Sequence, residues 1–373
     1  MTEPIRYGVI GTGMMGIEHI ANLNALDGAV VTAIADPHEG SRRGGAEVAD
    51  GEVEVFEDVT DLVAVDPCDA YVIVSPNHTH AEVVKQVMTT GRPFLLEKPM
   101  CTTVAECQDL VGAASDYPAP IWIGLEYRYM APVQRLIAEV ESGTIGNPRM
   151  IAIREHRFPF LPKVGDWNRF SANTGGTLVE KCCHFFDLMN HIARARPIRV
   201  YASGGQDVNH LDEVYHGRPS DMLDNALVII DYDNGVRAGL DLCMFAEASR
   251  NQEELSVVGD KGKVEALIPD DVLRIGLRGH HGVGRVDEQV IASTSPYAGQ
   301  HHGSSYVEHQ RFLDVIRNGG TPEVGVEEGL WSVAVGQAAH LSIDRGRPVT
   351  LEEVLAPVPE ASDHDGVFAQ KHP

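Results

Sequence analysis

Short apolar runs alternate with amphipathic stretches along the first part of the chain. The runs have the length of buried strands and cover residues 5–10, 30–35, 70–74, 94–96 and 121–124. The stretches between them repeat apolar positions with helical spacing, at residues 14–26, 80–90 and about 103–114. Strands that alternate with helices predict parallel pairing and right-handed crossovers. We therefore expect an α/β domain with a doubly wound parallel sheet over residues 1–125.

The pattern changes after Glu126, where strands begin to follow one another in series. The expected elements are a helix over 132–142, a strand over 150–157, one long helix over 178–193, strands from 199 to about 292, and helices over 304–318 and 326–344. Tight turns at 233–235 and 260–262 predict hairpins. This pattern predicts an α+β domain over residues 126–355, whose open, mostly antiparallel sheet has one uncovered face. Residues 356–373 are expected to form a loose tail.

Composition and charge exclude several classes of function. The 30 basic and 54 acidic residues give a net charge of −24, which disfavours binding to nucleic acid or to an anionic membrane. No apolar run approaches the roughly 18 residues of a membrane span, and the N-terminus lacks the pattern of a signal peptide. The six cysteines form no CxxC pair, and neither cysteines nor histidines have metal-site spacing. We expect a cytoplasmic protein without a metal site and without disulfides.

A glycine motif follows the first predicted strand and opens the first predicted helix. Its residues, in order, are Gly11, Thr12, Gly13, Met14, Met15 and Gly16. In a strand–turn–helix of the Rossmann type, such glycines permit a tight turn, close approach of a pyrophosphate and close helix packing. Asp36 ends the next strand, where a carboxylate can bind both adenosine ribose hydroxyls and repels a 2′-phosphate. The motif predicts NAD binding over NADP, although Arg42 and Arg43 could also reach a phosphate.

Further motifs give the chain a family resemblance that covers nearly its whole length. The segments that carry it are 75–80 (Ser-Pro-Asn-His-Thr-His), 97–99 (Glu-Lys-Pro), 143–148 (Gly-Thr-Ile-Gly-Asn-Pro) and Gly175-Gly176 before a helix with Glu180, His184 and Asp187. With the glycine motif, this arrangement resembles the glucose–fructose oxidoreductase/inositol dehydrogenase (Gfo/Idh/MocA) family. The resemblance implies an N-terminal NAD(P)-binding domain, an active site between the two domains, and an open C-terminal sheet that joins subunits into a homodimer or homotetramer.

The same resemblance assigns roles to individual residues. It implies that Ser75, Asn77 and His80 line the nicotinamide ribose, that Glu97 and Lys98 lie at the cofactor, and that Lys98 and His184 form the catalytic pair. Asp187 would contact a substrate hydroxyl, and Arg128 would lie near the substrate. Glu180 stands where family members often carry Asp, so its contact geometry is open.

The residues themselves support this chemistry. Glu180, His184 and Asp187 are spaced i, i+4 and i+7, which places them on one face of a single helix among apolar neighbours. Buried ionisable groups need partners or a function. We expect His184 to accept the proton of a secondary alcohol while Lys98 stabilises the developing alkoxide and Glu180 orients or neutralises Lys98. The alternatives are a surface lysine and a hydrogen-bonded core histidine.

Other residues are weaker candidates for substrate binding. Trp167 could pack on the apolar face of a sugar or be part of the core. Arg154 and Arg157, interleaved with His156, are expected to share a strand face, where they could bind a carboxylate or phosphate or else pair with acidic side chains. Lys181 could pair with Glu180 or another acid, or bind an acidic substrate. His301 or His302 could reach the substrate from the loop before the helix at 304, and we take His302 as the candidate.

The sequence as a whole predicts an NAD-dependent dehydrogenase that oxidises a secondary hydroxyl of a sugar, sugar derivative or cyclitol. One alternative is a redox-neutral enzyme that uses bound NAD to cleave a glycoside by oxidation and elimination. Another is a non-catalytic sensor that binds NAD and a sugar. Such a sensor could have lost Lys98, Glu180 and His184, so their presence in this sequence argues against it. The motifs do not select the substrate or its stereochemistry.

Overall fold

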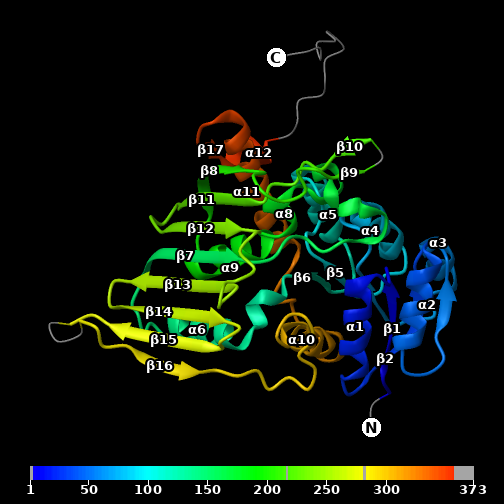
Figure 1. Cartoon of the computed structure of the whole chain (residues 1–373). Helices are drawn as coiled ribbons and strands as arrows, with labels where there is room; N and C mark the ends of the chain where they lie inside the picture. The colour runs from blue at the N-terminus through cyan, green and yellow to red at the C-terminus, as the bar shows by residue number, and fades with distance from the viewer. Residues whose placement is uncertain (1–2, 216, 280–282, 357–373) are drawn as a thin grey trace.

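Six parallel strands form the sheet of the N-terminal half (Figure 1). The structure, a computed structural model, describes residues 3–215, 217–279 and 283–356. The strands, in the spatial order β3-β2-β1-β4-β5-β6, are β1 (Ile5–Ile10), β2 (Ala29–Ala35), β3 (Glu54–Phe56), β4 (Ala70–Ile73), β5 (Phe94–Glu97) and β6 (Ile121–Gly124). This order reverses between β1 and β4, as in a Rossmann fold, and places the carboxyl ends of both strands at one crevice. The predicted doubly wound sheet is confirmed.

The helices of this half join consecutive strands. They are α1 (Met14–Asn24), α2 (Glu39–Val48), α3 (Val59–Val65), the 3-10 turn η1 (Asn77–Thr79), α4 (His80–Met88) and α5 (Val104–Ala114). A capping box of Thr103 and Glu106 starts α5. The apolar pattern did not predict α2, β3 or α3, because α2 is glycine- and charge-rich and β3 is three residues long with little burial.

A nine-stranded mixed sheet dominates the C-terminal half. Its spatial order is β16-β15-β14-β13-β7-β12-β11-β8-β17, and β7 and β12 form a parallel pair within otherwise antiparallel neighbours. The strands are β7 (Pro148–His156), β8 (Pro197–Gly205), β11 (Asn225–Tyr232), β12 (Arg237–Cys243), β13 (Glu253–Gly259), β14 (Gly262–Ile268), β15 (Val272–Leu277), β16 (Asp287–Val290) and β17 (Val349–Thr350), with a separate hairpin of β9 (Val214–Tyr215) and β10 (Arg218–Pro219). Both predicted hairpins are confirmed, at β11–β12 and β13–β14.

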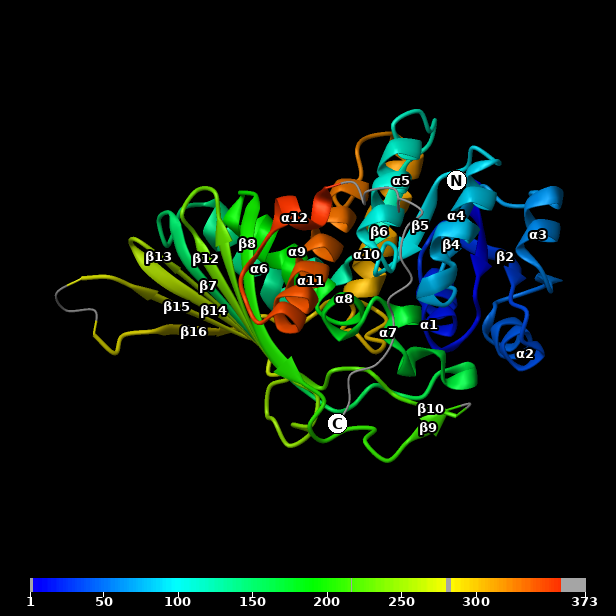
Figure 2. The same cartoon turned by 90° about the horizontal axis from the view of Figure 1, so that it is seen from above.

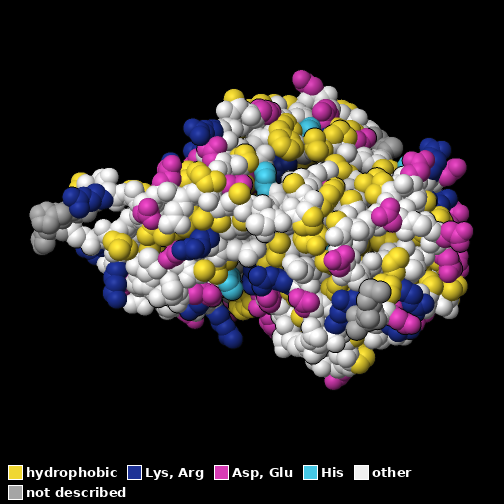
Figure 3. Space-filling view, turned by 90° about the horizontal axis from the view of Figure 1, so that it is seen from below, with side chains coloured by type: hydrophobic (Ala, Val, Ile, Leu, Met, Phe, Trp, Pro, Cys, Tyr) yellow, Lys and Arg dark blue, Asp and Glu magenta, His cyan; other side chains and the backbone are white. Residues whose placement is uncertain are grey.

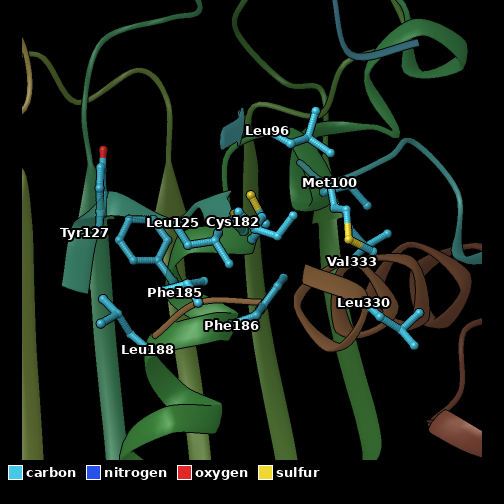
Figure 4. Packing of buried hydrophobic residues seen from close by; sticks show 14 of the residues in the cluster. Leu96, Met100, Leu125, Tyr127, Cys182, Phe185, Phe186, Leu188, Leu330 and Val333 are labelled. Atoms are coloured by element: carbon cyan, nitrogen blue, oxygen red, sulfur yellow. The ribbon is translucent and has the colours of Figure 1, made fainter. Parts of the chain in front are cut away.

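Helices cover one face of this sheet and separate it from the N-terminal half (Figure 2). The helical segments are η2 (Glu126–Tyr129), α6 (Ala131–Glu141), η3 (Val164–Arg169), α7 (Ser171–Thr174), α8 (Thr177–Glu180), α9 (Cys183–Ala193), α10 (Ser304–Asn318), α11 (Val326–Arg345) and α12 (Leu351–Leu355). Buried side chains of η2, α9 and α11 pack into one core with Leu96 and Met100, which flank the Glu-Lys-Pro segment of the N-terminal half (Figure 4). The domain boundary between residues 125 and 126 stays a prediction. Most of the expected tail, residues 357–373, lies outside the described residues.

The other face of the large sheet is open, as predicted. Apolar side chains exposed there include Met150, Tyr201, Leu227, Ile229 and Val258. Figure 3 shows acidic side chains along the outer edge of the N-terminal half. No helix in the part of the chain that the structure describes is long and apolar enough to cross a membrane.

The predicted single helix over 178–193 is wrong. The chain forms α8, turns at residues 181–182 and restarts as α9. The carbonyl of Glu180 accepts hydrogen bonds from the Lys98 ammonium at 3.4 Å and from the Cys183 thiol at 3.8 Å. Glu180 therefore ends one short helix, whereas His184 and Asp187 lie on the next.

Candidate active site

The glycine turn between β1 and α1 is shaped by close backbone contacts. Gly11 has φ +93°, and a Cβ there would lie 2.7 Å from backbone atoms at the end of β4. A Cβ on Gly16 would lie 2.1 Å from the Gly11 oxygen, whereas one on Gly13 would meet nothing within 4 Å. Met14 and Met15 begin α1. The start of α1 is thus open to a pyrophosphate, and the backbone fits a dinucleotide.

Asp36 lies beside this turn, at the end of β2. Its carboxylate accepts hydrogen bonds from the Thr12 and His38 amides, both at 2.8 Å. Arg42 donates to the Asp36 carbonyl at 2.7 Å and to the Pro37 carbonyl at 2.9 Å. The carboxylate is therefore anchored next to the glycine turn, where an adenosine ribose binds in a Rossmann fold.

The loops after β4 and β5 are held together by His80. This buried imidazole contacts the Ser75 carbonyl at 3.0 Å and the Pro99 carbonyl at 2.9 Å. The Ser75 hydroxyl accepts a hydrogen bond from Thr79 at 2.7 Å. Both ring nitrogens of His80 thus hold the backbone of the loops after β4 and β5.

Side chains from both halves meet at Glu180. Asn77 donates to its carboxylate, and the Lys98 ammonium contacts its backbone carbonyl at 3.4 Å. Burial alone would lower the pKa of Lys98, but the nearby Glu180 and Glu97 carboxylates outweigh it and raise that pKa. Lys98 is therefore a fixed positive charge. The Lys98 contact is to the Glu180 backbone carbonyl, and the Glu180 carboxylate acts on Lys98 through its charge.

His184 lies in the first turn of α9, close to Glu180. Its ring stacks on Tyr127, with ring centres 4.0 Å apart and an angle of 8° between the planes. Burial lowers the pKa of His184 well below its usual value, and the charge of Lys98 lowers it further. His184 is thus a neutral imidazole beside a fixed ammonium group. A neutral imidazole can accept a proton, and an ammonium can stabilise an alkoxide.

Two family models match the chain. The NAD-binding Rossmann-fold model of the Gfo/Idh/MocA oxidoreductases matches residues 5–125, and the model of their C-terminal α/β domain matches residues 137–351. Together these matches span most of the sequence. The chain belongs to the Gfo/Idh/MocA oxidoreductase family. It is therefore an oxidoreductase with an NAD-binding Rossmann domain.

Individual relatives of this Gfo/Idh/MocA chain align over nearly its whole length. Myo-inositol 2-dehydrogenase of Thermotoga maritima is 28% identical over 354 residues, which are 94% of this chain and 100% of the relative. Inositol 2-dehydrogenase 1 of Saccharopolyspora erythraea is 25% identical, over 93% of this chain and 96% of the relative. A levoglucosan dehydrogenase solved with NADH and levoglucosan shares the fold, with a TM-score of 0.83, 18% identity, and coverage of 94% and 100%.

Arg128 and Asp187 of this chain contact each other and not the site formed by Lys98, Glu180 and His184. The guanidinium of Arg128 donates to both oxygens of Asp187, at 2.5 and 2.6 Å, in a buried ion pair. This pair lines a hollow with Trp331 and His191, to which Lys98 and His184 do not contribute. The structure therefore does not bring Arg128 or Asp187 to the proposed catalytic pair.

Trp167, in the loop over residues 160–170, lies beside η1, the turn that follows β4. Its ring centre lies 6.0 Å from that of His78. Lys163, which the sequence analysis did not single out, precedes Trp167; burial lowers its pKa while Glu180 raises it. A lone loop lysine carries no sequence signal, so only the fold identifies it as a neighbour of Lys98 and Glu180.

The expectation that Arg154 and Arg157 share a strand face is wrong. Arg154 pairs with Glu254 on the open face of the sheet. Arg157 follows the end of β7 and lies 3.5 Å from Glu155, which points into the core. Lys181 also contacts Glu155, at 2.9 Å, and donates to the Tyr127 hydroxyl at 2.6 Å. The ion pairs weighed as the alternative are therefore present for both arginines.

Of the two adjacent histidines, His301 lies near Tyr127, the residue on which His184 stacks. Its Nδ1 lies 3.5 Å from Glu126, and its ring centre lies 5.9 Å from that of Tyr127. His302 is instead close to Asp271, whose charge raises the pKa that burial lowers. Glu126 lies in η2 and His301 in the loop before α10, far apart along the chain, which is why Glu126 gave no signal in the sequence.

Three buried carboxylates, Glu97, Glu126 and Glu308, present oxygen atoms within 4.8 Å of one another. Glu97 already accepts hydrogen bonds from His19 at 2.9 Å and from the Lys98 amide at 3.1 Å. Burial raises the pKa of Glu126 to about 8 and that of Glu308 well above its usual value. We infer that protons on Glu126 and Glu308 relieve the repulsion at neutral pH.

Proposed function

We propose that this chain is an NAD-dependent dehydrogenase that oxidises a secondary hydroxyl group of a sugar, sugar derivative or cyclitol. The observation that carries the proposal is the Lys98 ammonium at the Glu180 carbonyl, where its charge acts on the buried, neutral His184. The inositol dehydrogenases among the relatives support a polyol as substrate. The soluble interior of the cell is the proposed location.

In this proposal each residue has a separate task. When bound, the nicotinamide ring of NAD supplies the hydride acceptor. His184 takes the hydroxyl proton, while the Lys98 ammonium stabilises the negative charge that develops on the oxygen. Asn77 orients the Glu180 carboxylate. Trp167 and Arg157 remain proposed contacts of the substrate.

We propose NAD rather than NADP as the cofactor. Support comes from Asp36, whose carboxylate is anchored by the Thr12 amide where the 2′-hydroxyl of the ribose would bind. A 2′-phosphate there would meet a negative charge. Arg42 is engaged with two backbone carbonyls, which weakens its case as a phosphate ligand.

NADH absorbance across a panel of inositols, aldoses, uronates and amino sugars tests both points. We expect steady NADH formation with at least one polyol, and a much lower kcat/KM with NADP+ than with NAD+. Product release without net NADH would instead indicate the redox-neutral glycoside-cleaving enzyme. Saturable binding without turnover of any compound would indicate the sensor and contradict the proposal.

The open face of the large sheet is our proposed interface for a homodimer or homotetramer. Its exposed apolar side chains, Met150, Tyr201, Leu227, Ile229 and Val258, lie on β7, β8, β11 and β13, which together with β12 form the middle of the sheet. Light scattering should give the mass of a dimer or tetramer, and Leu227→Asp with Ile229→Asp should shift it towards the monomer. A monomeric wild type at micromolar concentration would contradict this proposal.

A further inference from the structure

Glu126 is an unusual buried carboxylate. Its side chain is 2% exposed, and neither of its oxygens has a hydrogen-bond partner among the described residues. Buried polar atoms are nearly always hydrogen-bonded, because an unpartnered group loses its hydration without compensation. An orphaned carboxylate next to a candidate active site therefore calls for a functional explanation.

Two histidines flank Glu126, one at each oxygen. Nδ1 of His184 lies 3.8 Å from Oε2, and Nδ1 of His301 lies 3.5 Å from Oε1. Both Nδ1 atoms are buried, and within the described ranges neither has a hydrogen-bond partner. Shifts of less than about 1 Å would bring each pair into hydrogen-bonding distance. Glu126 is thus placed to bridge the two imidazoles.

The two histidines differ in their access to solvent. The His184 side chain is 2% exposed, and that of His301 is 20% exposed. Since Nδ1 of His301 is buried, the exposed part of this ring lies elsewhere on it. The line His184–Glu126–His301 therefore leads from an enclosed imidazole to one that reaches water.

A dehydrogenase releases one proton for each alcohol it oxidises, and a proton on enclosed His184 has to leave. We propose that Glu126 and His301 form a relay that carries this proton from His184 to solvent. The relay rests on the proposed dehydrogenase function. It adds two residues to the chemistry, and both act through His184 rather than on the substrate.

The relay moves one proton in each turnover. The O–H bond of the alcohol breaks as an N–H bond forms at Nε2 of His184, while the carbinol hydride leaves with its electron pair to the nicotinamide. The Nδ1 proton of His184 passes to Oε2 of the Glu126 carboxylate. The carboxyl group then turns and donates to Nδ1 of His301, which releases its Nε2 proton to water. The alcohol is oxidised, NAD+ is reduced, and one proton is released.

The charges around Glu126 fit this task. The groups that face it are Glu97 and Lys98 after β5, Lys181 and His184 around the start of α9, His301 before α10, and Glu308 on α10. Burial, reinforced by the Glu97 charge, raises the pKa of Glu126 to about 8. Burial also lowers the pKa of both histidines, so each imidazole holds the transferred proton only briefly. The acceptor form of Glu126 is its carboxylate, which becomes more abundant as the pH rises through 8.

The test compares Glu126→Gln with wild type over pH 6–10, using the polyol identified by the NADH assay. We expect wild-type kcat to rise with pH around 8. Glu126→Gln should have a kcat about 10–100-fold lower, a smaller loss than removal of a direct base, and should lack that rise. KM and the Kd of NADH should change little. Glu126→Asp should restore part of kcat together with the rise.

His301→Ala and a control variant, His156→Ala, test the exit of the relay. His301→Ala should lose kcat and regain it as imidazole is added to the buffer. His156→Ala, at an imidazole that pairs with Asp241 on the large sheet, should keep wild-type kcat and show no response to imidazole. Wild-type kcat and pH dependence in both Glu126→Gln and His301→Ala would overturn the relay. Absence of turnover by the wild type would instead count against the dehydrogenase proposal, and NADH binding by every variant shows that the fold is kept.

Discussion

Replacing Lys98 with Met is expected to lower kcat by about 10²–10³-fold, the loss typical of removing one donor that stabilises an oxyanion. The ammonium is held near the Glu180 carbonyl at 3.4 Å, and the surrounding carboxylates keep it charged. Methionine has a similar length but carries no charge, so the developing alkoxide would lose its stabilising cation. Steady-state NADH formation with the best polyol of the panel measures the effect.

Binding controls separate chemistry from folding in this experiment. Lys98→Met should retain the Kd of NADH, because the glycine turn and Asp36 are untouched. Lys98→Arg should also be impaired, because the planar guanidinium does not replace a compact ammonium. Lys263→Met is the matched control, because Lys263 is an exposed lysine that pairs with Glu265 on β14 of the large sheet. This variant should keep the wild-type kcat. Full activity of Lys98→Met would remove Lys98 from the mechanism.

Replacing His184 with Asn is expected to lower kcat by about 10²–10⁴-fold, the range for loss of a general base. Asparagine keeps a polar side chain in the stacked position on Tyr127 but cannot accept the hydroxyl proton. His191→Asn, on the same helix, is the matched control and should keep its activity. Unaltered turnover in His184→Asn would show that this residue is a core histidine.

The pH dependence of the wild type adds a check on His184. Its pKa is lowered, so the neutral base persists below pH 6.5, the usual midpoint for histidine. His184 should therefore become protonated, and lose its function as a base, only at a pH well below 6.5. We expect no fall in kcat centred at pH 6.5. A drop centred near 6.5 that disappears in His184→Asn would contradict the buried, neutral imidazole.

Local patterns were enough to predict the Rossmann sheet and its cofactor turn. The run at 5–10, the glycines at 11, 13 and 16, and Asp36 after the next strand are signals within one strand–helix–strand unit, and the fold places them as expected. Strand and helix periods also predicted the open sheet. Patterns of this kind failed where packing rather than period decides, as in the break between α8 and α9.

The candidate site shows the same division. The resemblance pointed to Lys98, Glu180 and His184, and the fold brings these residues together from both halves. Arg128 and Asp187 matched the motif equally well, yet each is the partner of the other in a buried ion pair. A motif records which residue types are present, whereas the partner of a buried charge depends on which side chains lie within a few ångströms.

The sequence by itself determined that this protein has a dinucleotide turn with an acidic residue behind it and an α+β half with one uncovered sheet face, because turn chemistry and apolar period act between residues near in the chain. Only the tertiary structure decided that Glu126 lies between His184 and His301, with no hydrogen-bond partner for its carboxylate in the described part of the chain. These three residues come from separate segments, η2, α9 and the loop before α10. Their distances, burial and shared charge arise only when those segments pack against one another.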